Sequence, residues 1–217
     1  MVMAWRGKRP FRKIITFYIT NFFLVFMAYI RGRTTNRPFQ LVDERFCLRL
    51  GNEIQERAGK KPDLIVCDIA CGPRAAALTD LTAYYPQLRG IGLDYQLEDY
   101  EDARLKLVKG DVFSIPFENA ADVTYSAFLL ADIDTITFGC AEYLEKTAQA
   151  IFQIAKTLLP NGMAFVDEGA YSTGLYLLDD IIGEIEKQNP GYSKRFLTTN
   201  NQDGSPGCYL RIHRNGP

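Results

Sequence analysis

The chain has little of what the commonest catalytic centres need. Its 217 residues include one histidine, His213, and five cysteines, at positions 47, 67, 71, 140 and 208, without a Cys-x-x-Cys pair. A single imidazole excludes most Ser-His-Asp and Cys-His schemes. The cysteine spacing fits no familiar zinc site, so no metal is expected. An odd count of cysteines without such spacing is typical of a reduced intracellular protein, either cytoplasmic or attached to a membrane.

Acidic residues are absent from the first 42 positions, which carry eight lysine and arginine residues. The remainder has 17 basic and 26 acidic residues and therefore a net charge of −9. A basic arm thus precedes an acidic body. The acidic body argues against a track for a nucleic-acid backbone, and no DNA partner is expected.

The longest apolar run, residues 14–30, lies in the arm and contains no charged residue. As an α-helix its 17 residues would rise about 26 Å, near the lower limit for crossing a bilayer. Because apolar residues surround the whole helix, it must be buried in lipid or in protein. Attachment to a membrane surface through residues 6–37 and packing on the body, over its active site, both stay open. A targeting sequence is a third interpretation.

The arm is expected to end in a linker at residues 31–40 and a helix at residues 43–57. Gly32 and Pro38 break the first segment, and Gly59 and Pro62 end the helix. The sequence therefore predicts an N-terminal helical arm over residues 1–61 and a second domain over residues 62–217.

The second domain alternates short apolar strands with amphipathic helices. Strands are expected at 64–69, 89–93, 105–108, 122–128, 163–166, 194–199 and 208–213, and helices at 73–85, 139–158 and 175–185. This alternation predicts an α/β fold with a parallel sheet. The turn-rich stretch 200–207 joins the last two strands and predicts an antiparallel ending.

Small and acidic residues follow the first two strands, where an open α/β sheet binds its ligands. Ala70 and Gly72 come after Asp68, and such small residues let a ligand approach the backbone closely. The helix that follows offers its positive end to a carboxylate. Asp94 ends the second strand, 22 residues beyond Gly72, where a carboxylate can accept both hydroxyls of a ribose.

Similar residues follow the later strands. Asp111 and Val112 offer a polar atom and an apolar edge that suit an adenine ring, and Ser126 and Ala127 come after the fourth strand. Together, in this order and at these spacings, the strand ends indicate a nucleotide-like ligand. A plain dinucleotide-binding fold is disfavoured, because the sequence contains no Gly-x-Gly-x-x-Gly.

The series VCDIACGP, GIGLDY, KGDVFSIPF, ADVTYSAFLLADI and LLPNGMAFVDEG resembles class I S-adenosylmethionine-dependent methyltransferases over residues 62–213. The resemblance implies a Rossmann-like sheet of order 3-2-1-4-5-7-6 with strand 7 antiparallel. It implies S-adenosylmethionine as cofactor and methyl transfer as activity. The cofactor-binding residues that it implies are Asp68, Ala70, Cys71, Gly72, Pro73, Arg74, Asp94, Tyr95, Asp111, Val112, Ser126 and Ala127.

The chain departs from the family pattern at three places. Ala70 replaces the first glycine of the loop and Arg74 the last. The Arg74 side chain is expected either to clash with the methionine portion of the cofactor or to pair with its carboxylate. Only 16 residues separate Asp94 from Asp111, so the helix between the second and third strands must be short or missing.

The acceptor candidates follow the fourth and fifth strands and are Phe128, Asp132, Asp167, Glu168 and Tyr171. No residue stands out as a general base. His213 is expected to have a structural role or to lie at the surface, because an antiparallel strand 7 ends away from the cofactor. The tetrapeptide that starts at Ser126 differs from the Asn/Asp-Pro-Pro-Tyr/Phe of DNA adenine methyltransferases.

These features favour a methyltransferase with a small-molecule or lipid-like acceptor. Two alternatives stay open. A catalytically silent, methyltransferase-like assembly subunit would show the same alternation, and Arg74 is the residue that suggests it. A protein or RNA methyltransferase would use the basic arm to hold its partner.

Overall fold

The computed structural model describes residues 37–46, 48–127, 129, 133, 140–167, 183, 187, 191–200 and 206–216. The chain divides into two compact units, Met1–Arg37 and Pro38–Pro217. Almost all described residues belong to the second unit, so the predicted helix at residues 14–30 falls outside them. Among the described residues, no helix is long and apolar enough to cross a membrane.

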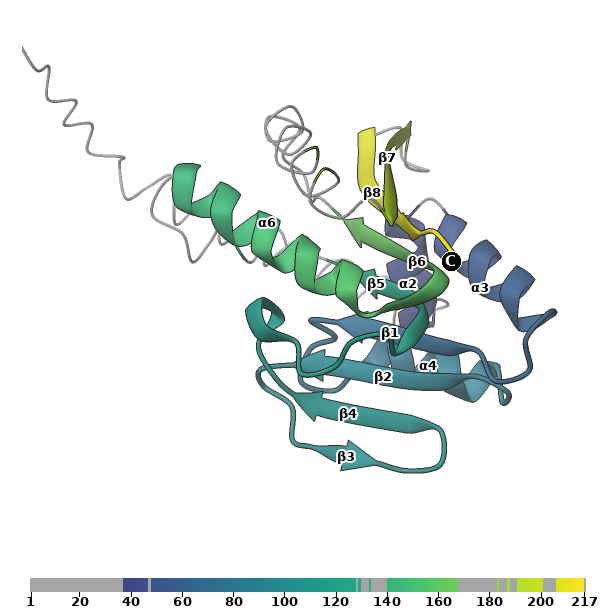
Figure 1. Cartoon of the computed structure of the whole chain (residues 1–217). Helices are drawn as coiled ribbons and strands as arrows, with labels where there is room; N and C mark the ends of the chain where they lie inside the picture. Colours follow the sequence, from purple (N-terminus) through teal and green to yellow (C-terminus); the bar gives the residue numbers. More distant parts are fainter. Residues whose placement is uncertain are drawn as a thin grey trace, which may run out of the picture. The chain divides into compact units, whose positions relative to one another are not determined.

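A mixed sheet of eight strands forms the centre of the second unit (Figure 1). The strands are β1 (Ile65–Ile69), β2 (Arg89–Asp94), β3 (Tyr100–Glu101), β4 (Leu105–Lys109), β5 (Ala121–Ser126), β6 (Leu158–Asp167), β7 (Tyr192–Asn200) and β8 (Pro206–Arg214). Their order is β3-β4-β2-β1-β5-β6-β8-β7. The five central strands from β4 to β6 are parallel, whereas β8 is antiparallel to both of its neighbours. Apart from β3, the predicted order with its antiparallel strand is confirmed.

The edge strand β3 lies where the sequence predicts a short or missing helix. It is only two residues long and pairs antiparallel with β4. Asp102 closes the turn between them, because its Oδ1 accepts hydrogen bonds of 2.7 Å from the backbone N–H groups of Arg104 and Leu105. A short edge strand flanked by acidic residues discourages pairing with another chain.

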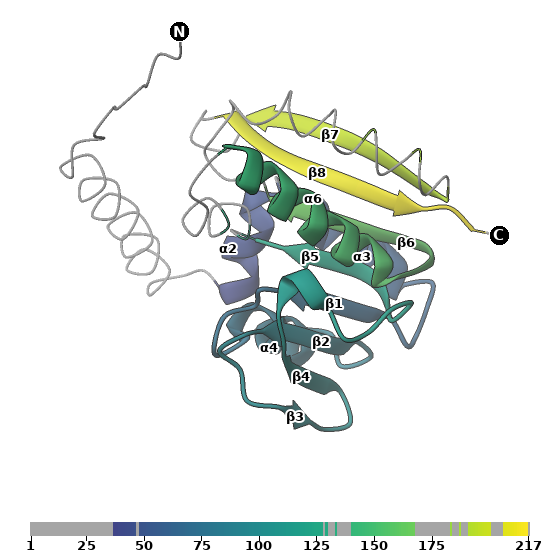
Figure 2. The same ribbon diagram turned by 60° about the vertical axis from the view of Figure 1, so that its left-hand side comes forward.

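Helices cover both faces of the sheet (Figures 1 and 2). One face carries α6 (Cys140–Lys156), whose buried residues recur at helical spacing: Thr147, Ala150, Ile151, Ile154 and Ala155. The other face carries α2 (Pro38–Arg45), α3 (Arg49–Ala58) and α4 (Ala76–Tyr84). Each face has its own buried apolar cluster.

Helices α2 and α3 replace the single helix predicted over residues 43–57. The chain turns at Leu48, where φ is 59°. This break sends the Phe46 ring into the core, edge-on to Phe165 at 5.9 Å and to Tyr209 at 5.7 Å between centroids. The Asp43 carboxylate then accepts the N–H of Gly51 at 2.7 Å and satisfies a donor in the first turn of α3.

The two helices also place the start of the compact unit earlier than the sequence predicts. Phe46, Leu50 and Ile54 are fully buried against Val66 and Phe165 of the sheet. The unit therefore begins at Pro38, whereas the sequence assigns everything up to residue 61 to the arm. Burial of a helix face against the sheet, which local periodicity does not specify, accounts for the difference.

The remaining elements differ from their predicted bounds by a few residues. Helix α4 begins at Ala76 rather than at Pro73, because residues 70–75 form the loop that follows β1. The strand predicted at residues 163–166 is longer at its start, because residues 158–162 also belong to β6, where Asn161 has a φ of 64° and the register with β5 shifts. The predicted helix at residues 175–185 lies outside the described residues except for residue 183.

Candidate functional site

The candidate site lies at the carboxyl ends of β4, β2, β1 and β5, which are neighbours in the sheet. The chain leaves β1 and β2 toward one edge and β5 toward the other, so the topology switches between β1 and β5. Open α/β sheets bind their ligands at this point. All of the described residues that the sequence predicts to bind a cofactor lie within six positions of one of these strand ends.

The loop after β1 folds beneath the end of β2. The N–H groups of Ala70 and Cys71 both donate to the carbonyl oxygen of Leu93, at 2.8 and 3.2 Å. Ala70 has a φ of 60° and Gly72 a φ of 74°, in the left-handed region that favours glycine. A Cβ atom on Gly72 would meet nothing within 4 Å, so the loop leaves open space above its backbone.

Asp94 links this loop to the end of β2. Its Oδ2 accepts the N–H of Gly72 at 2.9 Å, and its Oδ1 accepts the N–H of Gln96 at 2.8 Å. The residue is only 7% exposed. Each carboxylate oxygen can accept a second hydrogen bond. Asp94 can therefore hold the loop and still accept two hydroxyl groups of a ligand.

Asp68, at the end of β1, is the most perturbed acid of the site. It is 4% exposed, and its burial raises the pKa of its carboxyl to about 8. The nearby charge of Asp94 also raises this pKa, whereas the Tyr125 hydroxyl lowers it. A buried carboxyl of this kind favours a cationic partner, which would keep it ionised.

Two cysteines flank Asp68 without forming a reactive pair. Cys67 is buried, and burial together with the charge of Asp68 raises the pKa of its thiol. The same two causes raise the pKa of the Cys71 thiol. Because the thiolate is the nucleophilic form, neither cysteine is suited to covalent catalysis. The structure gives no group of three metal-ligating side chains among the described residues.

The last two strand ends of the predicted cofactor site are also in place. Asp111 is exposed and accepts the N–H of Phe113 at 2.9 Å, which caps a short 3-10 turn, Val112–Ser114. Val112 is half-buried against the apolar cluster beneath it. Ser126 is buried, and its hydroxyl donates to the carbonyl oxygen of Ile69 at 2.8 Å. Ala127 is half-buried beyond it.

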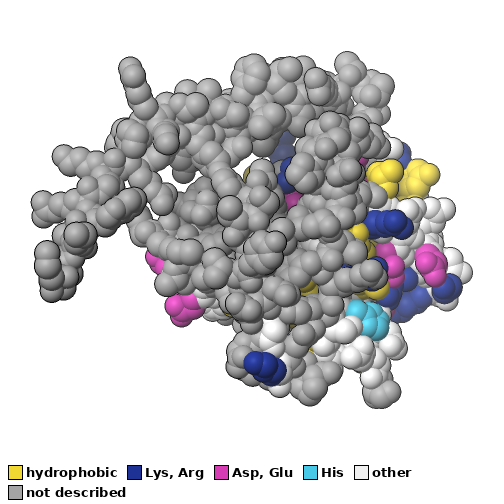
Figure 3. All heavy atoms as spheres, turned by 90° about the horizontal axis from the view of Figure 1, so that it is seen from above, with side chains coloured by type: hydrophobic (Ala, Val, Ile, Leu, Met, Phe, Trp, Pro, Cys, Tyr) yellow, Lys and Arg dark blue, Asp and Glu magenta, His cyan; other side chains and the backbone are white. Residues whose placement is uncertain are grey.

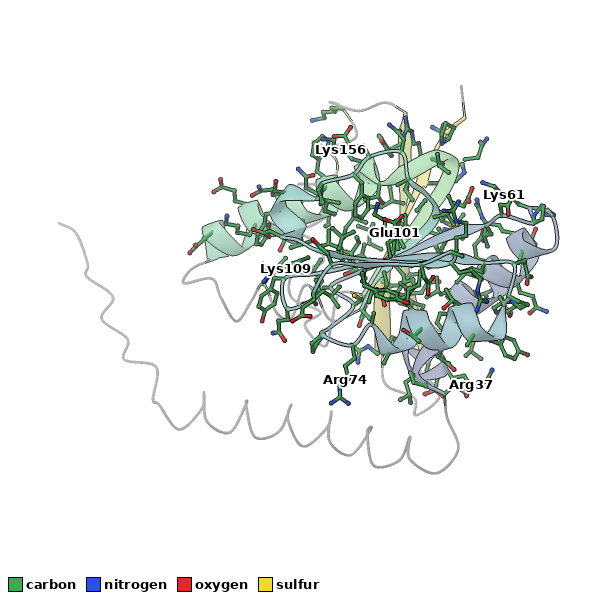
Figure 4. All side chains as sticks on the ribbon, turned by 90° about the horizontal axis from the view of Figure 1, so that it is seen from below. Arg37, Lys61, Arg74, Glu101, Lys109 and Lys156 are labelled. Carbon is green, nitrogen blue, oxygen red and sulfur yellow. The ribbon has the colours of Figure 1, made fainter. Side chains whose placement is uncertain are left out.

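Arg74 lies at the surface and extends away from the sheet (Figure 4). It forms no hydrogen bond or ion pair with the described residues. Pro73 is exposed beside it. The long side chain therefore leaves the space above Gly72 open. The clash or the ion pair with the cofactor stays a prediction. Tyr95, at 68% exposure, also lies at the rim of the site.

The acceptor side is described only at Asp167. This residue ends β6, and its Oδ2 accepts a hydrogen bond of 2.6 Å from the guanidinium of Arg45 in α2. The Asp167 side chain is 5% exposed and is therefore shielded from water, whereas the Arg45 side chain is 34% exposed. Phe128, Asp132, Glu168 and Tyr171 lie outside the described residues. His213 pairs with Met163, near the middle of β6, whereas Tyr209 pairs with Asp167 at the carboxyl end of that strand.

Sequence reasoning missed three residues of this site. Tyr125 is buried on β5 and pairs in register with Asp68. Strand alternation identifies its face, but no motif singles it out. Phe39 and Arg45 reach the site from α2, which was predicted to be part linker. No local signal in the sequence connects α2 with β5 or β6.

The charged side chains do not form a field of one sign. Figure 3 shows basic and acidic side chains mixed along the described part of one face. The surface cations Lys60 and Lys61 are paired with Glu56 and Asp122. This part of the surface therefore offers no continuous basic track.

No protein-family model matches the chain, and no curated protein matches it significantly. Solved structures do match its fold. The N-methyltransferase NodS from Bradyrhizobium japonicum WM9 is 14% identical, with 83% of this chain and 98% of that chain covered and a TM-score of 0.50. The cyclase SpnF is also 14% identical, with coverages of 77% and 81% and a TM-score of 0.50.

A third similar structure is a variant of a 16S rRNA adenine methyltransferase from Catenulisporales acidiphilia. It is 12% identical, with coverages of 76% and 92% and a TM-score of 0.50. These proteins differ in what they act on, and one is called a cyclase, so the likeness concerns architecture and not one reaction. The strand order and the antiparallel β8 agree with it. The chain therefore has the fold of the class I S-adenosylmethionine-dependent methyltransferases.

Proposed function

We propose that the protein is an S-adenosylmethionine-dependent methyltransferase. The observation that carries the proposal is the hydrogen bond from Gly72 to Asp94, which joins an open backbone loop to a buried carboxylate at the topological switch point. This combination suits a ligand with a ribose and a charged amino-acid end. When bound, S-adenosylmethionine would supply an electrophilic methyl group.

The residues present fit the two ends of this cofactor. The buried Asp68 carboxyl suits the ammonium group of the methionine portion. The first N–H groups of α4 receive no hydrogen bond from a side chain of the N-cap residue, Ala75, and they suit the carboxylate. Asp94 would accept the ribose hydroxyls. Asp111 and Val112 would contact the adenine, one through an exposed carboxylate and the other through an apolar edge.

We propose a small molecule or a lipid-like compound as the acceptor. The second unit is acidic, and charges of both signs are mixed on the described part of the face in Figure 3, which argues against a nucleic-acid substrate. The apolar run at residues 14–30 and its basic flanks support a lipid-like acceptor and attachment to an anionic membrane surface. Binding of the full-length chain to anionic and to neutral vesicles tests this part of the proposal.

Calorimetric titration of S-adenosylhomocysteine into the full-length chain tests the proposed cofactor. We expect micromolar binding, and we expect Asp94→Ala to weaken it at least tenfold, or by about 1.4 kcal/mol. Asp99→Ala is the matched control, because Asp99 lies in the same acidic stretch and, among the described residues, accepts only the backbone N–H of Lys109, at 2.7 Å. Equal losses in both variants would contradict the assignment of Asp94.

The same titration separates the two alternatives. If the full-length chain is folded but binds no S-adenosylhomocysteine, the proposed methyltransferase activity is refuted and a catalytically silent assembly subunit is favoured. Cofactor binding that survives deletion of residues 1–37, together with loss of a protein or RNA partner, would favour the arm as a macromolecule-binding element.

A further inference from the structure

Tyr125 is a fully buried residue of β5 that none of the predicted site features includes. It pairs in register with Asp68 of the neighbouring parallel strand β1. Side chains in register on neighbouring strands leave the sheet on the same face. Tyr125 and Asp68 therefore project together toward the face that carries α2, α3 and α4.

The Tyr125 hydroxyl is buried and makes no hydrogen bond of standard geometry with the described residues. It lies close enough to Asp68 that the acid raises the pKa of the tyrosine, after burial as the larger cause. A buried hydroxyl without a partner is unfavourable, and in most proteins such groups are paired. The Asp68 carboxyl beside it can become its partner, because a carboxylate accepts a hydrogen bond when it is ionised.

Phe39 of α2 packs against the tyrosine ring. The two centroids are 6.2 Å apart, and the ring planes meet at 70°, an edge-on contact. The N–H of Phe39 donates to Asp80 of α4 at 3.3 Å, which ties the start of α2 to α4. The tyrosine ring therefore packs against the start of α2, which is tied to α4, and Asp68 of β1 is a polar neighbour of its hydroxyl.

The other ionisable groups around Asp68 would not hold its carboxylate. The charge of Asp94 raises the pKa of this acid, and burial and Asp68 raise the pKa of the Cys67 and Cys71 thiols, which therefore stay neutral and supply no positive charge. Two charged residues of α2 bind elsewhere. Asp43 accepts from Gly51, and Arg45 pairs with Asp167.

We propose that Tyr125 is a positioning residue for the cofactor, whose hydroxyl donates to the ionised Asp68 carboxyl and holds it toward the methionine end. The inference rests on the proposed function, since it is the cofactor's ammonium group that would stabilise the ionised acid. Without ligand the acid binds a proton at neutral pH, because burial raises its pKa to about 8. Binding would release that proton, and the hydroxyl would favour the release.

The test compares the full-length chain with Tyr125→Phe and Tyr85→Phe, by titration with S-adenosylhomocysteine between pH 6 and pH 9. Tyr85 packs against the same apolar cluster and is the matched control for loss of a hydroxyl. We expect Tyr125→Phe to bind about tenfold more weakly at pH 6 to 7, which is the effect of one hydrogen bond to a charged group. The loss should shrink toward pH 9, as the acid becomes ionised in both proteins, and Tyr85→Phe should match the parent.

Urea unfolding of the same variants distinguishes positioning from stability. Since the hydroxyl makes no hydrogen bond of standard geometry with the described residues, Tyr125→Phe should unfold at the same urea concentration as the parent or a higher one. A lower midpoint, or affinity and pH dependence equal to those of the parent, would overturn the positioning role and leave the proposed function standing. Absence of binding at every pH would instead refute the proposed function and the inference with it.

Discussion

Replacement of Asp68 by asparagine should make the fold more stable as the pH rises, relative to the parent chain. Asp68 is 4% exposed, and burial raises its pKa from 3.8 to about 8. The folded protein therefore binds a proton between these values that the unfolded chain has released. This contribution to stability is fully present below pH 3.8 and is lost as the pH rises through about 8.

The size of the stability change follows from the one proton that the folded protein binds and the unfolded chain does not. Stability changes by about 1.4 kcal/mol per pH unit for each proton that is bound only in the folded state. From pH 5 to pH 7 the parent should therefore lose about 3 kcal/mol that Asp68→Asn retains. Other titrating groups are shared, so they cancel in the difference between the two proteins.

Urea unfolding of the parent and Asp68→Asn at pH 5, 6 and 7 measures this difference. Asp102→Asn is the control. The N–H groups of Arg104 and Leu105 lower the pKa of this exposed acid, so its titration affects stability only below this pH range. Stability curves for parent and Asp68→Asn that run parallel from pH 5 to pH 7 would refute the argument. The variant should also bind S-adenosylhomocysteine more weakly, so that stability and binding change in opposite directions.

Two further substitutions test the loop after β1 and the contact from α2. Ala70→Gly should stabilise the protein by about 0.5 to 1 kcal/mol in urea unfolding, because Ala70 has a φ of 60° and the left-handed conformation costs alanine more than glycine. Ala77→Gly, inside α4, should destabilise it by about 1 kcal/mol. Stability changes of the same sign in the two variants would contradict the reasoning. Arg45→Met should destabilise the fold by about 2 kcal/mol, because Asp167 is 5% exposed and would lose the charge of Arg45. This value is smaller than for a fully buried pair, because the Arg45 side chain is 34% exposed. Lys60→Met, which breaks an exposed pair with Glu56, should leave the urea midpoint unchanged, and a similar fall in both variants would count against a special role for Arg45.

The parallel part of the sheet was predictable because its signals are local. Short apolar runs bounded by turn residues locate β1, β2, β4 and β5 to within a residue or two, and the hairpin signal at residues 200–207 locates β7 and β8. Chain order and right-handed connections then leave few topologies. The carboxyl ends of parallel strands lie at one edge of a sheet. The sequence therefore predicted that the residues at or after these strand ends lie at the same edge: Asp68, Gly72, Asp94 and Asp111.

The elements that were missed depend on contacts between distant segments. Residues 43–57 have helical periodicity throughout, yet the chain turns at Leu48 because Phe46 is buried between the rings of Phe165 and Tyr209. The interval between Asp94 and Asp111 gives no alternation strong enough to predict β3, which exists because the unpaired edge of β4 was available. Tertiary packing outweighs local propensity in both cases.

The sequence by itself determined the order of the strands, the loop that follows β1 and the acids at the strand ends, because each depends on neighbouring residues. Only the tertiary structure decided that Asp94 bonds the loop through Gly72, that Tyr125 lies beside Asp68, and that α2 reaches both β5 and β6. These pairs are separated by 22 to 122 residues in the sequence. Burial of Asp68 is likewise a property of everything packed around it, and burial is what sets its proton affinity.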